Sequence, residues 1–365
     1  MPNPTITELF FQLIQCGIGQ RDSLSAVPSK EQWTEIWEIA EKQSLMGIAY
    51  SGIASMPQSQ RPPKQILLSW HQVAETIKEN SALQCKQCKA VSNKFLTDGF
   101  RNCILKGQGI AQYYPDPLLR NPGDIDIWLE GGYKRISEYI RRYFPNIEPL
   151  YHHMDFPIKK GLSIEVHFTP SWMHSPLKNR KLQKFFVEKF EEQCSNTANG
   201  NFPVPAIAFN RVYILLHIFR HLFQEGIGMR QMLDYYFILK QGMNTTEKEE
   251  YTRTLKELGL LKFASAVMYA MQAMFAMDRT LMPVAPDRKR GEFLVNEILI
   301  AGNFGKYDSR YRIVSKDKEF LHFWNSMQRT ARLVRQYPSE ALWSPYFKVW
   351  HFFWRKQRKQ KAKKK

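Results

Sequence analysis

The 365-residue chain is long enough for two or three domains, and its content of 44% hydrophobic and 13% aromatic residues excludes a disordered polypeptide. Of the formal net charge of +18, residues 355–365 carry +8 and the rest of the chain +10. This charge favours phosphate-bearing partners without choosing among nucleotides, nucleic acid and anionic lipid. The N-terminus lacks the features of a signal peptide. The longest nearly uncharged apolar run, residues 263–277, is too short to span a bilayer. We therefore expect a cytoplasmic protein.

The first hundred residues have a helical pattern. Apolar residues recur at spacings of three and four from residue 5 to about residue 100, and Ser29 with Gln32 fits a capping box. Residues 62 and 63, both proline, separate two of the helical segments. We therefore expect an N-terminal helical region over residues 1–95.

The periodicity changes after residue 100. A short apolar run at 102–106 ends in Gly107, and further along Asp124 and Asp126 stand two residues apart in an alternating apolar segment. Alternation predicts a strand with both carboxylates on one face. Asp is disfavoured in a strand and two like charges on one face repel each other, so this pattern is typical of a functional site. Carboxylates placed this way are suitable ligands for Mg²⁺, and a third ligand would complete the site.

A hairpin further along the chain supplies a candidate third ligand. If residues 159–161 form its loop, Asp155 lies directly opposite Glu165, and His153 and His167 share their face. Like charges opposite each other destabilise a ladder, so this register requires a shared cation or proton, unless the register differs. The alternative is an ordinary solvent-exposed sheet face.

Helical patterns return after residue 176, with one extended stretch expected at 202–209. Residues 210–223 form a strongly apolar helix with His217 and His221 at i, i+4, and residues 229–240 form a helix with Arg230 and Asp234 at the same spacing. The second pair is consistent with an ion pair on a helix surface. Amphipathic helices are expected at 320–354, before a lysine-rich tail that nucleic acid or a membrane surface could contact.

The order of these motifs resembles the DNA polymerase beta-like nucleotidyltransferase superfamily: a short strand, a glycine turn, a helix, a D-x-D strand and a third acid in a later strand. The blocks LKG, YPDPLLRNPGDIDIWL, HHMDF with IEVHF, and HIFRH with GMRQMLDY look more closely like an uncharacterised bacterial nucleotidyltransferase family. The similarity runs over residues 80–240 approximately, with a weaker match at 302–305.

The resemblance implies an α+β fold. Its small mixed-sheet nucleotidyltransferase core would occupy residues 96–175, between the N-terminal helices and a C-terminal helical region at 176–345, with a basic tail at 346–365. The implied activity is the Mg²⁺-dependent transfer of an NMP from an NTP, ATP among the candidates, to an unidentified hydroxyl-bearing acceptor, with release of pyrophosphate. Two Mg²⁺ ions are expected.

The resemblance also assigns residues. The catalytic and metal-binding acids would be Asp124, Asp126 and Glu165, the last as metal ligand or general base. The nucleotide-binding set would be Lys106, Gly107, Gln108 and Arg120. Gln108 replaces the serine found in the wider superfamily, so lysine, arginine or backbone amides would hold the phosphates. The accessory residues would be Asp155, His167, His217, Arg230 and Asp234.

Two other functions remain open at this point. The same fold could serve as a non-catalytic nucleotide- or RNA-binding module, because a fold does not imply an activity. In the second alternative, His153, His167, His217 and His221 would form the transition-metal site of a hydrolase.

Overall fold

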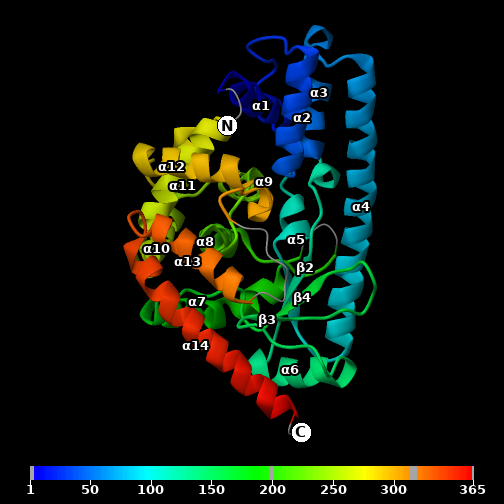
Figure 1. Ribbon diagram of the computed structural model, residues 1–365. Coiled ribbons are helices and arrows are strands. Elements are labelled where there is room, and N and C mark those ends of the chain that lie inside the picture. Colours follow the sequence, from blue (N-terminus) through cyan, green and yellow to red (C-terminus); the bar gives the residue numbers. More distant parts are fainter. Residues whose placement is uncertain (1–3, 198–200, 312–318, 364–365) are drawn as a thin grey trace.

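The computed structural model describes residues 4–197, 201–311 and 319–363, which form an α+β fold with one four-stranded mixed sheet among helices (Figure 1). The N-terminal helices are α1 (Pro4–Gly17), α2 (Lys30–Lys42), α3 (Met46–Ser55) and α4 (Lys64–Thr97). The central elements are β1 (Asn102–Leu105), α5 (Gly107–Ala111), β2 (Ile125–Leu129), α6 (Gly132–Tyr143), β3 (His153–Asp155) and β4 (Ile164–His167). The C-terminal helices are α7 (Pro176–Ser195), α8 (Ile207–Gln224), α9 (Met229–Lys240), α10 (Thr245–Leu258), α11 (Leu261–Phe275), α12 (Arg288–Ala301), α13 (Glu319–Leu333) and α14 (Pro338–Lys363).

The N-terminal helices pack closely on one another and lead into the long helix α4, which runs along one side of the molecule (Figure 1). The capping box at the start of α2 is confirmed: the Ser29 hydroxyl accepts from the Gln32 N–H, and the Gln32 side chain accepts from the Ser29 N–H. Helices α1 and α3 cross with their backbones in contact, since a Cβ on Gly52 would lie 2.2 Å from the Leu13 carbonyl oxygen.

The sheet has the order β1-β2-β4-β3, with β2 and β4 parallel and the other two pairs antiparallel. The hairpin register predicted from the sequence is confirmed, because His153 pairs with His167 and Asp155 with Glu165. The parallel pair places Asp126 beside Glu165. Two acids from strands almost forty residues apart in the chain therefore become neighbours on one face of the sheet.

The two faces of the sheet meet different helices. One face is apolar and packs on α4 and α6, in a cluster that includes Val91, Phe95, Ile127, Ile136 and Val166. The other face carries the acids and histidines beneath α7 and α8, where the Trp128 ring contacts Phe186, Phe190 and Phe209. The alternative of a solvent-exposed polar face is wrong for Asp126 and His167, which are 2% and 1% exposed.

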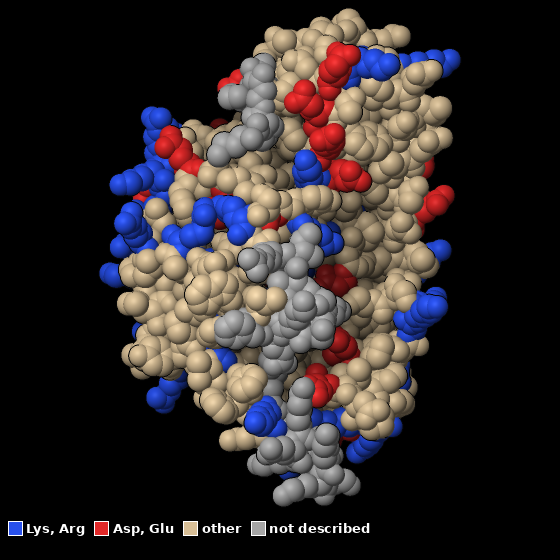
Figure 2. Space-filling view, in the orientation of Figure 1, with Lys and Arg blue, Asp and Glu red and all other residues tan. Residues whose placement is uncertain are grey.

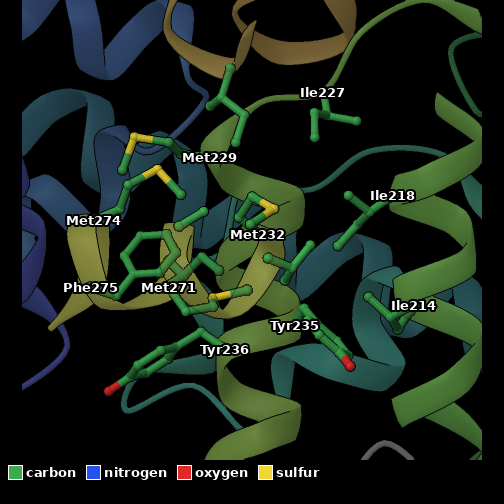
Figure 3. Packing of buried hydrophobic residues seen from close by; sticks show 14 of the residues in the cluster. Ile214, Ile218, Ile227, Met229, Met232, Tyr235, Tyr236, Met271, Met274 and Phe275 are labelled. Carbon is green, nitrogen blue, oxygen red and sulfur yellow. The ribbon is translucent and has the colours of Figure 1, made fainter. Parts of the chain in front are cut away.

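Helices α8, α9 and α11 form the centre of the C-terminal region. Figure 3 shows residues of this core, including Met229, Met232 and Tyr235 from α9 and Met271 and Phe275 from α11. Helix α9 has the bounds predicted from the sequence, whereas α8 begins at Ile207, inside the stretch that we expected to be extended up to residue 209. Both helices are buried almost all round, so polar side chains on them face the protein interior.

The C-terminal helix α14 extends to Lys363 and therefore includes most of the segment that we expected as a basic tail. Its exposed side includes the aromatic residues Trp343, Tyr346, Trp350 and Phe353. On the face shown in Figure 2, acidic and basic side chains are interspersed despite the large positive net charge. In the described parts of the chain, we find no helix with the length and apolar character needed to cross a membrane.

Candidate active site

A pocket of about 450 Å³, including its open mouth, lies where the sheet meets α8 and α9. It brings together residues from the turn after β1, the start of β2, the two helices and the short helix η4 (Asn303–Gly305). Its charged and polar lining residues are Lys106, Arg120, Asp124, Asp126, His217, Arg230, Gln231 and Asp234, and Gly107 and Phe304 also line it.

The turn between β1 and α5 has an unusual backbone. Lys106 has φ 52° and ψ −152°, a conformation that only glycine adopts readily, and Gly107 follows with φ 46°. Such a conformation costs of order 1–3 kcal/mol and is found mostly at functional sites. The turn directs the ammonium group of Lys106 onto Asp126, with Nζ 2.8 Å from Oδ1.

Asp126 is the most buried acid of the pocket. Besides Lys106, its Oδ1 has His167 Nε2 at 2.8 Å. Burial would raise the pKa of Asp126, but the Lys106 charge and the His167 hydrogen bond outweigh it and hold this pKa below its ordinary value. Burial would lower the pKa of His167, but its contacts with Asp126 and Glu165 outweigh burial and raise it. Asp126 is therefore a carboxylate at neutral pH, as a metal ligand must be.

Glu165 lies beside Asp126, and its side chain is 25% exposed to solvent. Its Oε2 is 3.6 Å from both His153 Nδ1 and His167 Nε2. Burial raises the pKa of Glu165, but the contacts with the two histidines prevail and lower it to about 2. Oxygen and nitrogen atoms of Asp126, Glu165 and His167 lie within 4.8 Å of one another, close enough to hold one metal ion.

Asp124 occupies a different place from the one we expected. It precedes β2 by one residue and lines the pocket beside Asp126 rather than standing inside the strand. The three predicted acids thus fall into two sets that share Asp126: Asp124 and Asp126 line the pocket, and Asp126 and Glu165 meet on the sheet. Asp155, opposite Glu165, is exposed, and it belongs with His153 and Glu165 to a further group that could hold a metal.

Arg120 and Asp234 form a buried ion pair across the pocket. Arg120 Nε and Nη2 donate to Oδ1 and Oδ2 of Asp234, both at 2.8 Å, and the Tyr114 hydroxyl donates to the same carboxylate. The expected ion pair of Arg230 with Asp234 on a helix surface is wrong, because α9 is buried and Asp234 faces Arg120. Most of the donors of Arg120 are therefore committed within the protein.

Arg230 has weaker protein contacts than Arg120. Its Nη1 donates to the carbonyl oxygens of Asn121 and Pro122 at 3.4 Å, and its buried Nε has no hydrogen-bond partner among the described residues. The guanidinium carbon is 5.5 Å from the ring centre of Phe304. Of the two arginines lining the pocket, Arg230 has more donors left for a ligand.

Gln108 points away from the pocket. Its side-chain amide donates to Ser81 Oγ and Gln84 Oε1, both on α4. Its side chain therefore takes part in packing α5 against α4, and the expectation that this side chain contacts the nucleotide is not supported by its position. Only its backbone remains near the turn at Lys106 and Gly107.

The histidines considered for a hydrolase divide into two groups. His217 lines the pocket and its ring lies 4.2 Å from that of His221, on the same helix, and both are buried. His153 and His167 instead meet His152, whose Nε2 is 3.0 Å from His153 Nδ1. His152 was not among the predicted site residues, because strict alternation puts it on the apolar face of the hairpin, but β3 begins only at His153.

Arg220 is a second residue that sequence analysis did not assign. Its guanidinium lies over the Trp172 ring at 4.1 Å, and its Nη2 donates to His221 Nε2. Burial lowers the pKa of Arg220, while Glu165 and Asp126 are among the charges that act against this. Its position three residues after His217, on the same side of the helix, is the sequence signal that could have identified it.

A family model described as an uncharacterised nucleotidyltransferase family matches residues 29–276. The chain belongs to this family. Comparisons with curated proteins and with solved structures gave no match. The family match includes every predicted site residue and ends at α11, so Phe304, which lines the pocket from η4, lies outside the matched region.

Family membership supports nucleotidyl transfer as the general activity. The donor atoms near Asp126 suit a divalent metal, since carboxylate oxygens are available from Asp124, Asp126 and Glu165. The pocket also combines these acids with the cations Lys106 and Arg230, which is the combination that a polyphosphate bound through a metal requires.

Proposed function

We propose that this protein transfers a nucleoside monophosphate from an NTP to a hydroxyl-bearing acceptor and releases pyrophosphate. The observation that carries the proposal is a single pocket in which Asp124 and Asp126 stand beside Lys106 and Arg230. The acceptor oxygen would form a bond to the α-phosphorus, the bond to pyrophosphate would break, and the acceptor would lose its proton.

The roles of the chain's own residues follow from their positions. Asp124 and Asp126 would hold Mg²⁺, which when bound neutralises phosphate charge and favours the ionised hydroxyl. Lys106 and Arg230 would bind the phosphate oxygens, and the strained turn at Gly107 would allow the backbone to approach them. Glu165 lies beside Asp126 at the partly open edge and would accept the acceptor proton or join the metal ligands.

Label transfer tests the proposal directly. The full-length protein would be incubated with each α-labelled NTP, Mg²⁺ and a cell extract, and the labelled product would be isolated. We expect Asp126→Asn and Asp124→Asn to lose at least about 100-fold in transfer, because each removes a charged metal ligand. Glu130→Gln is the matched control, since Glu130 follows the same strand at its other end and pairs with Arg101.

Folding of each variant would be checked by circular dichroism and thermal unfolding. Asp124 is only partly buried, so its variant remains informative even if the Asp126 variant is unstable. Transfer at the wild-type rate by a folded Asp124→Asn or Asp126→Asn protein contradicts the assignment. NTP binding without label transfer in any extract would instead favour a binding module.

A further inference from the structure

Helix α14 lies at the edge of the molecule, and one of its sides holds it in place (Figure 1). On this side the Phe347 ring lies 5.4 Å from the ring of Tyr151, which precedes β3, and 6.1 Å from that of Trp172, which follows β4. Beside Phe347, the ammonium group of Lys348 lies 2.5 Å from the hydroxyl oxygen of Ser326 on α13. The helix is therefore docked on the sheet region and on α13 through these contacts.

The other side of α14 carries an exposed apolar stripe. Residues 342, 346, 349 and 353 recur at spacings of three and four, so their side chains share one face of the helix. The exposed fractions of the stripe residues are between 42% and 71%, and these residues are Leu342, Trp343, Tyr346, Val349, Trp350 and Phe353. A surface helix normally presents polar side chains to solvent, so an apolar stripe on the outward face indicates a binding surface.

The sequence that follows the apolar stripe is strongly basic. No Asp or Glu follows Glu340, and residues 355–365 carry +8. Helix α14 continues to Lys363, so most of this charge lies on the same helix as the stripe. Between residues 341 and 354, Lys348 is the only Lys or Arg, and it belongs to the docked side. An uncharged apolar stripe is thus followed directly by a run of cations.

We propose that the apolar stripe and the basic segment 355–365 together bind the surface of an anionic lipid bilayer. Aromatic and aliphatic side chains enter the boundary between headgroups and acyl chains, where Trp and Tyr are enriched, and Lys and Arg bind acidic headgroups. The stripe covers about 17 Å of helix and is too short to cross a hydrocarbon core of about 30 Å. Helix α14 would therefore lie along the bilayer surface.

Two other occupants of the stripe fit these features less well. Single-stranded nucleic acid is bound by grooves in which cations lie among aromatic side chains, whereas the cations of α14 follow the stripe. A second copy of the chain would add another segment of +8 to the first, and a large net charge opposes self-association. An anionic bilayer suits both parts of the helix, because it offers an apolar interior beneath a negative surface.

Flotation of the full-length protein with lipid vesicles tests the inference. We expect wild type to bind vesicles of phosphatidylcholine and phosphatidylserine at least about 100-fold more tightly than vesicles of phosphatidylcholine alone. Most of this preference should disappear when the salt concentration is raised from about 0.1 M to about 0.5 M. Brominated acyl chains should quench part of the tryptophan fluorescence, since Trp343 and Trp350 would enter the bilayer.

Two variants separate the apolar contribution from the electrostatic one. Tyr346→Ser/Phe353→Ser should weaken binding to the anionic vesicles by at least about 10-fold and reduce the quenching. Replacing every Lys and Arg of residues 355–365 by Gln should abolish the preference for phosphatidylserine. The matched control is Leu68→Ser/Leu83→Ser, because these two apolar side chains are 56% and 51% exposed on α4, on the other side of the molecule in Figure 1. This control should bind vesicles like wild type.

Folding of the variants would be checked by circular dichroism, and the Gln variant remains a test if the serine variant is unstable. Wild type that does not float with anionic vesicles overturns the inference, as does wild-type binding and quenching in a folded Tyr346→Ser/Phe353→Ser protein. Binding of RNA but not of vesicles, or a wild-type dimer that this variant converts to a monomer, would overturn it in favour of nucleic acid or a second copy. The assay contains no nucleotide, so its result is independent of label transfer.

Discussion

The two arginines lining the pocket differ in how their charges are matched. Arg120 is held by both oxygens of Asp234, whereas Arg230 has only long contacts to backbone carbonyl groups. A bidentate buried pair is a structural element, because removing one partner leaves the other charge uncompensated. A guanidinium with free donors can instead bind an anion.

This difference predicts opposite effects for two similar substitutions. Arg230→Met is expected to weaken NTP binding about 10- to 100-fold, the contribution of one charge-assisted hydrogen bond, with little change in stability. Arg120→Met should destabilise the protein by about 3–5 kcal/mol because Asp234 is left buried and unpaired. Calorimetric NTP titration and urea unfolding measure the two effects. Unchanged NTP affinity in the Arg230 variant would refute the phosphate role.

At the scale of elements, the short helix η4 is held in contact with the turn between α8 and α9. A Cβ on Gly305 would lie 1.8 Å from the Glu225 carbonyl oxygen, and Gly305 has φ 67°. The neighbouring Phe304 lines the pocket and faces the Arg230 guanidinium. The close backbone contact therefore positions one wall of the pocket, although η4 lies outside the family match.

We expect Gly305→Ala to displace η4 and to reduce both stability and NTP affinity. Gly242→Ala is the matched control, because Gly242 has a similar φ of 73° but nothing within 4 Å of an added Cβ. The overlap with Glu225 should make the Gly305 variant less stable than the Gly242 variant by about 1–3 kcal/mol, the usual cost of overpacking. Equal melting temperatures for the two variants would show that the contact is unimportant.

At the scale of the whole molecule, the C-terminal helices cover the polar face of the sheet and bury several histidines. Burial lowers the pKa of His217 and His221 well below its ordinary value and that of His174 to about 3. The unfolded chain therefore binds more protons than the folded protein between about pH 4 and 6.5. In this range the free energy of unfolding therefore increases as the pH rises and decreases on acidification.

The protein should thus be less stable at pH 5 than at pH 7. Each buried neutral histidine lowers the free energy of unfolding at pH 5 by about 2 kcal/mol relative to neutral pH. His217→Asn should flatten the pH dependence of urea unfolding, whereas His71→Asn should leave it unchanged because its side chain is exposed. A wild-type slope in the His217 variant would contradict this origin of the acid sensitivity.

The ordered motifs and their family resemblance predicted the α+β fold class, which the structure confirms, and local patterns predicted the hairpin beside the candidate site. Alternation around residues 159–161 predicted the hairpin register, which the structure confirms at Asp155 and Glu165. Periodicity predicted α9 with its observed bounds. These predictions succeeded for the same reason. The direction of a side chain within one strand or helix follows the backbone repeat, and the spacing of nearby apolar residues in the sequence reveals that repeat.

Tertiary structure alone decided which distant side chains meet. Asp234 pairs with Arg120, 114 residues away, rather than with Arg230 on its own helix, and Gln108 turns to α4 instead of the pocket. His152, which precedes β3, lies with His153 and His167 in one group of ring nitrogens. The apolar repeat in a sequence specifies which face of a helix or strand is buried, but not which distant element packs against that face. The pairing of buried charges and polar groups depends on how the helices and sheet pack together.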